Sequence, residues 1–161
     1  MRIRRVYTRE EALSRMAAYC SSAEHCLSEV RAKLNVMQLT SGDIEIILDR
    51  LVDEGFVDEQ RFCKAYVLDK MRYNGWGRNK ISVMLAQKQV DKQAISDAID
   101  SIEDDEYYGI MKQIIDNKRR SVSAKSTYER NAKLMRFALG RGFEMSLVSR
   151  YLNTIEETDE I

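Results

Sequence analysis

Proline is absent from the 161-residue chain, and glycine occurs only seven times. These two residues most often interrupt regular structure, so their scarcity leaves room for long uninterrupted helices. Alternating apolar and polar runs typical of half-buried strands are also missing. Apolar residues instead recur with a helical period, and we therefore predict an all-α protein.

Long apolar runs are missing as well. No window approaches the roughly 18 apolar residues that a membrane-spanning helix needs, and the first residues, MRIRRVYTREE, have no apolar stretch typical of a signal peptide. The three cysteines are an odd number, which disfavours a disulfide framework. We expect a cytoplasmic protein with free thiols and no membrane partner.

Motifs for catalysis and metal binding are scarce too. The sequence contains no GxxxxGK[ST] phosphate-binding loop, and the acidic stretch at 100–106 lacks the spacing of a calcium-binding loop. The single histidine, His25, lies near Cys20 and Cys26, but no fourth zinc ligand is evident. We predict no enzyme activity, no catalytic residue, no metal site and no cofactor.

An internal repeat organises the chain. Five apolar positions recur at an offset of 51 residues and then at an offset of 53, without gaps. The three sets are Val30, Leu34, Leu39, Ile44 and Leu48, then Ile81, Leu85, Val90, Ile95 and Ile99, then Leu134, Ala138, Phe143, Val148 and Leu152.

The third and fourth positions of each set have the spacing of a hydrophobic staple, which fixes how the chain enters a helix. Each repeat therefore contains a helix, a stapled turn and a second helix, and a further helix is predicted before each pair, at about 8–20, 58–74 and 105–120. We predict three tandem three-helix repeats, at 1–54, 55–103 and 104–161. Because each is too small to bury its apolar face alone, we expect them to stack into an elongated, curved array.

Helix starts are recognisable from their capping residues. Thr8 with Glu11 fits a capping box, and Thr40 and Asp91 precede the third helices of repeats one and two. Glu144 is a less usual cap at the corresponding point of repeat three. We also predict that Asp58 and Asp105 cap the first helices of repeats two and three.

The stretch LVDEGFVDEQRF, residues 51–62, joins the first two predicted repeats. Gly55 is placed to adopt the left-handed conformation that ends a helix, and Asp58 to cap the next one. Val57 and Phe62 then form another staple. The sequence predicts a tight join between these repeats.

Charge is segregated along a chain whose formal net charge is zero. Residues 60–90 carry a net charge of +6 and residues 107–141 carry +7, whereas residues 91–106 between them carry −6. Cations neutralise phosphates, and aromatic rings stack on bases, so the two basic segments are candidates for binding nucleic acid or an acidic partner. The plain alternative is that these cations belong to solvated helix faces and favour helix carboxyl ends.

The candidate contacts are the cations of these two segments together with the only tryptophan. Trp76 could equally pack between repeats as touch a partner. The residues are Lys70, Arg72, Trp76, Arg78, Lys80, Lys118, Arg119, Arg120, Lys125, Arg130, Lys133 and Arg136.

Three stretches of the chain resemble the RecX family of bacterial regulators of the RecA recombinase. They are LDRLVDEGFVDEQRFCKAYV at 48–67, NGWGRNKISVMLAQKQVDKQAISDAI at 74–99 and KLMRFALGRGFEMSLVSRYL at 133–152. The most specific positions are Leu51, Gly55, Asp58, Arg61 and Phe62, a Gly-aromatic-Gly motif, then Ile81, Leu85 and Lys88, and finally Arg141, Gly142 and Phe143.

This resemblance implies a regulator, built of tandem three-helix repeats, that binds in the groove of the RecA–DNA filament. It implies inhibition of ATP hydrolysis and strand exchange, a role in DNA repair, recombination and the SOS response, and, in some members, direct DNA binding. It supplies no catalytic residues. Gln89 stands where the family commonly has glycine, Glu144 stands where it has a small polar cap, and residues 35–40 match least well.

The sequence therefore favours a cytoplasmic, monomeric, non-enzymatic regulator whose partner is the RecA filament, with single- or double-stranded DNA as a possible further partner. Two alternatives stay open. One is an independent helix-turn-helix-like DNA-binding protein that uses the basic stretch at 118–136. The other is a helical-repeat adaptor for an unrelated protein.

Overall fold

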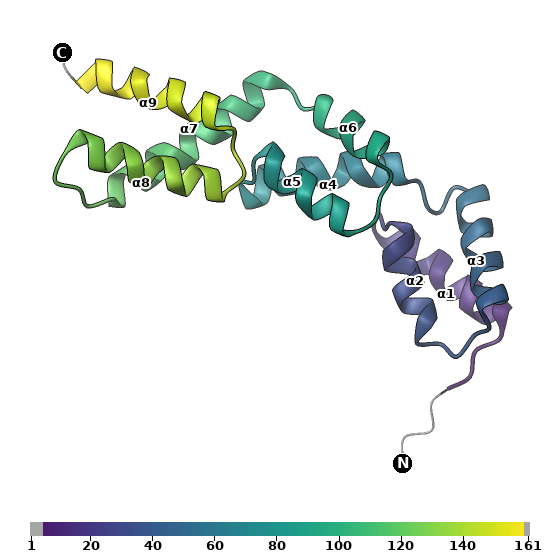
Figure 1. Ribbon diagram of the computed structural model, residues 1–161. Coiled ribbons are helices and arrows are strands. Elements are labelled where there is room, and N and C mark those ends of the chain that lie inside the picture. Colours follow the sequence, from purple (N-terminus) through teal and green to yellow (C-terminus); the bar gives the residue numbers. More distant parts are fainter. Residues whose placement is uncertain (1–4, 160–161) are drawn as a thin grey trace. The chain divides into compact units, whose positions relative to one another are not determined.

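A computed structural model describes residues 5–159 and shows nine α-helices and no β-strand in that range, which confirms the all-α prediction (Figure 1). The first helices of the three predicted repeats, expected near 8–20, 58–74 and 105–120, are α1, α4 and α7. The helices are α1 (Arg9–Ser22), α2 (Leu27–Asn35), α3 (Ser41–Asp53), α4 (Glu59–Asn74), α5 (Arg78–Gln87), α6 (Lys92–Asp100), α7 (Asp104–Ser121), α8 (Thr127–Gly140) and α9 (Met145–Asp159).

By their internal contacts, the helices group into two compact units. Unit 1 comprises residues 1–65 and 85–97, and unit 2 comprises residues 66–84 and 98–161. This division differs from the repeat boundaries predicted from the sequence, which stay predictions.

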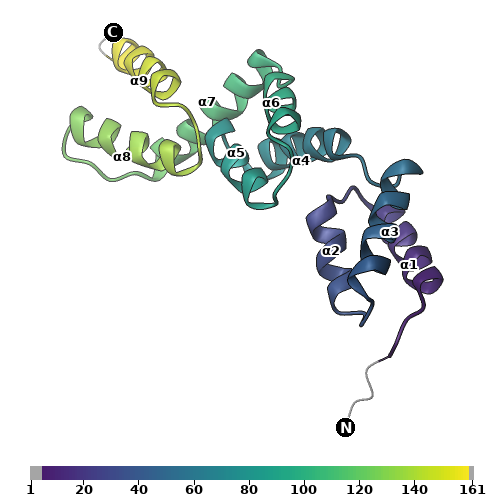
Figure 2. The same ribbon diagram turned by 45° about the vertical axis from the view of Figure 1, so that its right-hand side comes forward.

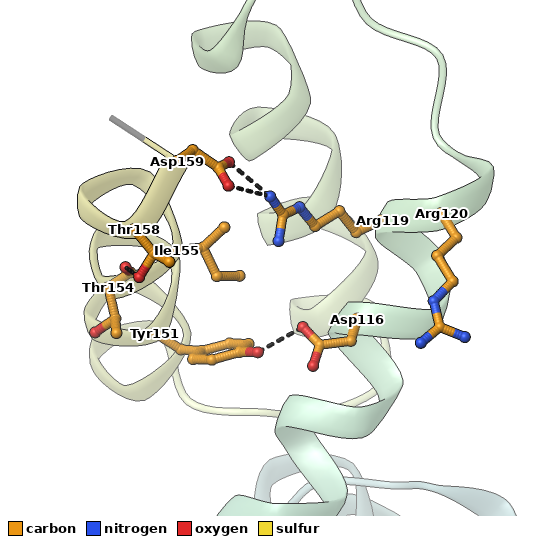
Figure 3. Close-up of a pocket in the computed structure, with 8 residues that line it drawn as sticks. All are labelled: Asp116, Arg119, Arg120, Tyr151, Thr154, Ile155, Thr158 and Asp159. Atoms are coloured by element: carbon orange, nitrogen blue, oxygen red, sulfur yellow. Dashed lines mark hydrogen bonds and ion pairs between the residues drawn. The ribbon is translucent and has the colours of Figure 1, made fainter. Parts of the chain in front are cut away.

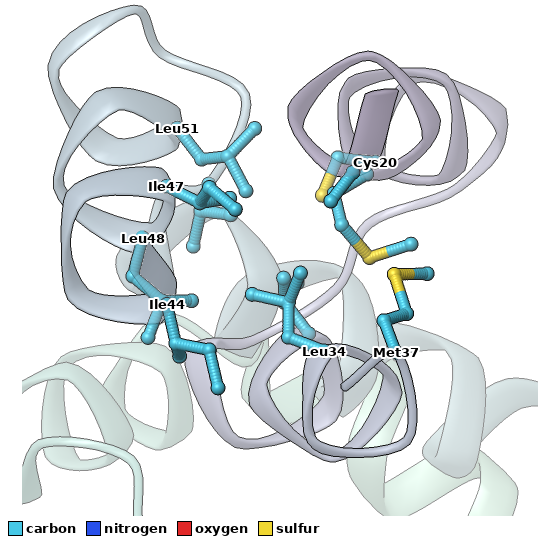
Figure 4. Packing of buried hydrophobic residues seen from close by; sticks show 11 residues of the cluster. Cys20, Leu34, Met37, Ile44, Ile47, Leu48 and Leu51 are labelled. Atoms are coloured by element: carbon cyan, nitrogen blue, oxygen red, sulfur yellow. The ribbon is translucent and has the colours of Figure 1, made fainter. Parts of the chain in front are cut away.

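The core of unit 1 forms where α1 and α2 pack on α3. Ile44, Ile47 and Leu51 project from α3 towards Leu34 of α2 and Cys20 of α1 (Figure 4). Their spacing of three and four residues places them on one helix face, which is why the apolar pattern of this segment predicts its buried side.

In unit 2, α8 packs against both α7 and α9 (Figure 2). Tyr107, Met111 and Ile115 of α7 are buried, as are Leu134 of α8 and Phe143 in the turn before α9. Of the fifteen repeat positions identified in the sequence, all but Leu39 and Ile99 are buried. The repeat therefore marks core positions throughout the chain.

Most of the predicted helix caps are confirmed. The side chains of Thr8, Thr40, Asp58 and Asp91 each accept a hydrogen bond from the backbone N–H three residues later. The prediction for Asp105 is wrong, because α7 begins at Asp104 and Glu103 is its N-cap residue, without a side-chain cap. Asp105 instead lies in the first turn of α7, where a negative charge is favourable near the positive end of the helix dipole.

The join at Gly55 has the predicted conformation. Gly55 has a φ of +79° and follows Glu54, the C-cap residue of α3. The N–H of Gly55 donates to Val52 O at 3.0 Å, and the N–H of Val57 donates to Leu51 O at 3.1 Å. Val57 and Phe62, the predicted staple, are both buried.

Arg61 ties this join to the rest of unit 1. Its guanidinium donates to Gly55 O at 3.0 Å and to the Glu24 carboxylate at 2.5 Å. One side chain thus satisfies a carbonyl just beyond the end of α3 while pairing with the segment after α1. This gives a structural role to an arginine that the sequence marked only through the family resemblance.

Three equivalent turns share a left-handed residue. Gln38, Gln89 and Gly142 stand at the repeat offsets of 51 and 53 and have φ angles of +58°, +59° and +96°. Each directly precedes an apolar staple residue. The departure at Gln89 therefore leaves the turn conformation unchanged and places a side chain where glycine is favoured.

We predict that Gln89→Gly stabilises the protein. The left-handed conformation costs an L-residue about 1–2 kcal/mol, and glycine avoids this cost while losing about 0.5–1 kcal/mol through the freedom of the unfolded chain. The expected net gain is about 0.5–1 kcal/mol in the free energy of unfolding. Urea denaturation measures it, with Gln87→Gly in the last turn of α5 as the matched control. A Gln89→Gly variant no more stable than this control would contradict the turn assignment.

Candidate functional site

All twelve predicted contact residues lie in unit 2. The five residues from Lys70 to Lys80 lie at the end of α4, in the α4–α5 loop and at the start of α5. The seven residues from Lys118 to Arg136 lie in the last turn of α7, in the α7–α8 loop and on α8. Their roles as partner contacts stay predictions, but their surroundings within the unit differ sharply.

Trp76 lies in the α4–α5 loop between two lysines. The ammonium of Lys80 lies 4.6 Å from the indole ring centroid and that of Lys70 lies 5.3 Å from it. The indole is partly exposed. Trp76 is therefore not a buried core residue, and its ring is already in contact with two lysines. Cation–π attraction holds both lysines over the ring, at about 0.5–1 kcal/mol each at exposed sites.

Arg72 is engaged in a bidentate ion pair with Glu106. The two hydrogen bonds measure 2.6 and 3.2 Å and join the last turn of α4 to the first turn of α7. Hydrogen bonding to Arg72 holds the pKa of the Glu106 carboxyl below its usual range. Both side chains are substantially exposed, so the pair orients the helices more than it stabilises them.

Arg78 is the centre of a polar cluster, defined here as Arg78, Asp104, Tyr107 and Glu144. Its guanidinium donates to Asp104 and to Glu144, each at 2.9 Å, and lies 3.9 Å from the centroid of the Tyr107 ring. Only 20% of the Arg78 side chain is exposed. The cluster joins the start of α5 to α7 and to the start of α9.

Tyr107 is the fully buried member of the polar cluster. Its buried hydroxyl accepts from the backbone N–H of Arg78 at 3.0 Å and donates to the Glu144 carboxylate. Burial, together with this bond to Glu144, raises the pKa of Tyr107, so the phenol stays protonated and remains a donor.

The cluster explains the unusual residue at the start of α9. The backbone carbonyl of Glu144 accepts from Leu147 and Val148, as a capping position requires. Its carboxylate is directed instead to Arg78 and Tyr107. A small polar cap could not reach these partners.

Two glycines let the backbone of the α4–α5 loop touch that of the α8–α9 turn. The Gly77 N–H donates to Arg141 O at 2.8 Å, and the Asn79 N–H donates to Gly142 O at 3.0 Å. A Cβ on Gly77 would lie 2.4 Å from the Gly142 carbonyl, and one on Gly142 would lie 2.4 Å from Lys80 Cβ. The contact therefore requires glycine on both sides. Since α5, α7 and α9 meet here, it fixes how they pack.

The basic residues of α7 and α8 are only partly available. Arg119 and Arg130 both pair with Asp159 of α9, and the Lys133 ammonium donates to Ser123 O at 2.6 Å. The Lys118 ammonium lies 5.0 Å from the centroid of the Phe137 ring. These cations hold unit 2 together as well as giving it positive charge.

Three of the nominated cations are exposed and make no ion pair among the described residues. They are Arg120 at the end of α7, Lys125 in the following loop and Arg136 on α8. Tyr128, which the sequence-based selection missed, is 86% exposed on α8. Tyr128 lies in the first turn of α8, three residues after Lys125 of the loop, and this closeness in sequence to a nominated cation could have indicated it.

The cysteine and histidine residues of unit 1 are packed into the protein. Cys20, Cys26 and Cys63 are buried free thiols, and burial raises the pKa of Cys63 to about 11. His25 stacks on Tyr19 with ring centroids 3.7 Å apart. Within residues 5–159, no group of three or more histidine, cysteine or acidic residues is placed to hold a metal ion. Nor is any helix of that range long and apolar enough to cross a membrane.

The nine helices of residues 5–159 and their recurring buried positions define a protein built of helical repeats. A family model described as the second three-helix domain of RecX matches residues 58–99, and one described as the third three-helix domain matches residues 104–152. The chain belongs to the RecX family. The prediction of tandem three-helix repeats is thereby confirmed.

Curated relatives span similar lengths. The chain is 28% identical to the Regulatory protein RecX of Vibrio parahaemolyticus over 139 residues, covering 86% of this chain and 87% of the relative. It is 26% identical to that of Acinetobacter baylyi over 140 residues, covering 87% and 85%. The crystal structure of RecX from Lactobacillus salivarius has the same fold, with a TM-score of 0.79, 20% identity and coverage of 95% of this chain and 97% of that one.

Proposed function

We propose that this protein binds the RecA–DNA filament and inhibits RecA ATPase, recombinase and strand-exchange activity, without catalysing a reaction itself. The observation that carries the proposal is the pair of RecX domain matches, which together reach from residue 58 to residue 152. The exposed cations Arg120, Lys125 and Arg136 of unit 2 support it, since the filament contains DNA phosphates.

Nine of the twelve nominated residues fall into three groups in this proposal. Arg72, Arg78, Arg119 and Arg130 shape unit 2 through internal ion pairs. Arg120, Lys125 and Arg136 are exposed and, together with Tyr128, are the residues that we propose to contact the filament. Lys70 and Lys80 also remain candidates, since an ammonium over an indole ring keeps its charge.

Co-sedimentation tests filament binding directly. RecA filaments assembled on single-stranded DNA with a slowly hydrolysed nucleotide are pelleted, and the amount of this protein in the pellet is measured. We expect saturable recovery that requires RecA and exceeds recovery with DNA alone. Protein that stays in the supernatant at stoichiometric RecA would contradict the proposal.

A second candidate function is independent binding of duplex DNA through the loop and helix at 118–136. The exposure of Lys125, Tyr128 and Arg136 within this segment favours it. Gel shifts without RecA, on duplexes of different sequence, separate the two. Tight, sequence-selective binding would support the second candidate, whereas weak binding that falls steeply with salt would be non-specific.

A further inference from the structure

Two guanidinium groups from different helices converge on one carboxylate in unit 2. Arg119 of α7 donates to both carboxylate oxygens of Asp159, at 2.7 and 2.6 Å, and Arg130 of α8 donates to one of them at 2.9 Å (Figure 3 shows Arg119). The hydrogen bonds from Arg119 and then from Arg130 hold the pKa of Asp159 below its usual range. The site is therefore occupied by an ionised oxyanion at neutral pH.

Arg130 has donor capacity that Asp159 does not use. Only 19% of its side chain is exposed, and its Nη2 atom is buried without a hydrogen-bond partner among the described residues. A guanidinium presents five N–H donors in a fixed fork, which suits an anion with more than two oxygens. A carboxylate fills this site only in part.

Open space and further cations surround the arginine pair. A hollow of about 580 Å³ between α7 and α9 is lined by Arg119, Arg120, Thr154, Thr158 and Asp159. Arg120 lies apart from the Arg119–Asp159 pair in Figure 3.

Arg130 lines a second hollow, of about 230 Å³, together with Lys125 and Ser126. Arg119 and Asp159 line the first hollow and Arg130 lines the second, so the ion pairs of Asp159 connect the two. Each hollow also contains a cation that makes no ion pair among the described residues, Arg120 in the first and Lys125 in the second. An extended polyanion could follow this path.

From this arrangement we infer that Arg119 and Arg130 form a phosphate-binding clamp for single-stranded DNA, which Asp159 occupies in the free protein. A phosphate offers a guanidinium fork the same bidentate geometry as a carboxylate, with additional oxygens for Arg130. Tyr128, exposed three residues after Lys125, provides a ring on which a neighbouring base stacks. That ring favours nucleic acid over an acidic protein segment. DNA must displace Asp159 to bind.

This inference concerns DNA alone and needs no recombinase, so its failure leaves the proposed regulation of RecA intact. The test is fluorescence anisotropy of a labelled oligothymidylate with Asp159→Asn. The matched control is Glu157→Gln, which removes the same charge from an exposed residue of α9 that makes no ion pair among residues 5–159. We expect Asp159→Asn to tighten binding about fivefold or more and Glu157→Gln less than about twofold, because only the first frees the clamp.

A second substitution locates the effect. Adding Arg119→Gln to Asp159→Asn should remove the gain, since the freed clamp then lacks one fork. Equal effects of the two single substitutions, a gain that survives the double substitution, or no binding by any variant even at low salt would each overturn the inference.

Hydrogen exchange on the unmodified protein covers the case in which Asp159→Asn disturbs folding. Oligothymidylate should speed exchange of the amides at 155–159, because displacement of Asp159 releases the last described turn of α9. Exchange that is slowed or unchanged there while DNA is bound would also overturn the inference.

Discussion

Gly77→Ala should destabilise unit 2 by about 3 kcal/mol, at the upper end of overpacking effects. The added Cβ would lie 2.4 Å from Gly142 C, Gly142 O and Phe143 N. These are backbone atoms, which cannot rotate out of the way as a flexible side chain can. The two hydrogen bonds that join the α4–α5 loop to the α8–α9 turn would have to lengthen or break. Gly77 has no left-handed φ, so the whole effect is steric.

Urea denaturation followed by circular dichroism measures this loss. Gly109→Ala is the matched control, since Gly109 lies within α7 and a Cβ there would meet nothing within 4 Å. Alanine is favoured over glycine inside a helix by about 1 kcal/mol, so the control should gain stability. If both variants moved in the same direction, close backbone contact at Gly77 would not be what holds this junction.

Arg78→Met should cost about 2 kcal/mol of unfolding free energy, less than for a fully buried ion pair because the site retains some solvent. Methionine keeps the apolar stem over the Tyr107 ring but removes the guanidinium. The Glu144 carboxylate, 26% exposed, then loses its charged partner and keeps only Tyr107. This leaves a half-buried negative charge without compensation.

The control for this prediction is Arg72→Met, which removes an equally well-formed but exposed ion pair with Glu106. It should change stability little. In addition, Glu144→Gln should reduce the cost of Arg78→Met, because the unpaired charge is gone. Equal costs at Arg72 and Arg78, with no coupling to Glu144, would mean that the polar cluster does not stabilise the junction.

Local features of the fold were predictable because short-range chemistry determines them. Gly55 and Asp58 act on the backbone within three residues, and Thr8 and Thr40 do the same. The repeat was recognisable because equivalent helices bury apolar side chains at equivalent positions. At Asp105 the several adjacent acids of this stretch left the start of α7 ambiguous by two residues.

The polar cluster could not be predicted from the sequence. Arg78 meets Tyr107 across 29 residues and Glu144 across 66. The sequence identified Glu144 as unusual for a cap but gave no sign of where its carboxylate would point. The left-handed conformation of Gln38 and Gln89 could not be predicted from residue type either, because glutamine is not one of the residues that favour turns.

Charge counting located the basic segments but did not distinguish paired cations from available ones. Arg119 and Arg120 are neighbours in sequence, yet the first is bound to Asp159 and the second is exposed. That distinction depends on α9, which folds back beside α7 from far along the chain. Exposed Tyr128 was overlooked because the selection followed charge and the single tryptophan.

Steady-state ATP hydrolysis by RecA on single-stranded DNA tests the central claim most directly. As this protein is titrated to stoichiometry with RecA, the hydrolysis rate should fall, and Lys125→Glu combined with Arg136→Glu should weaken the inhibition without loss of fold. A hydrolysis rate that stays constant across the titration, with the protein shown to be folded, would contradict the account.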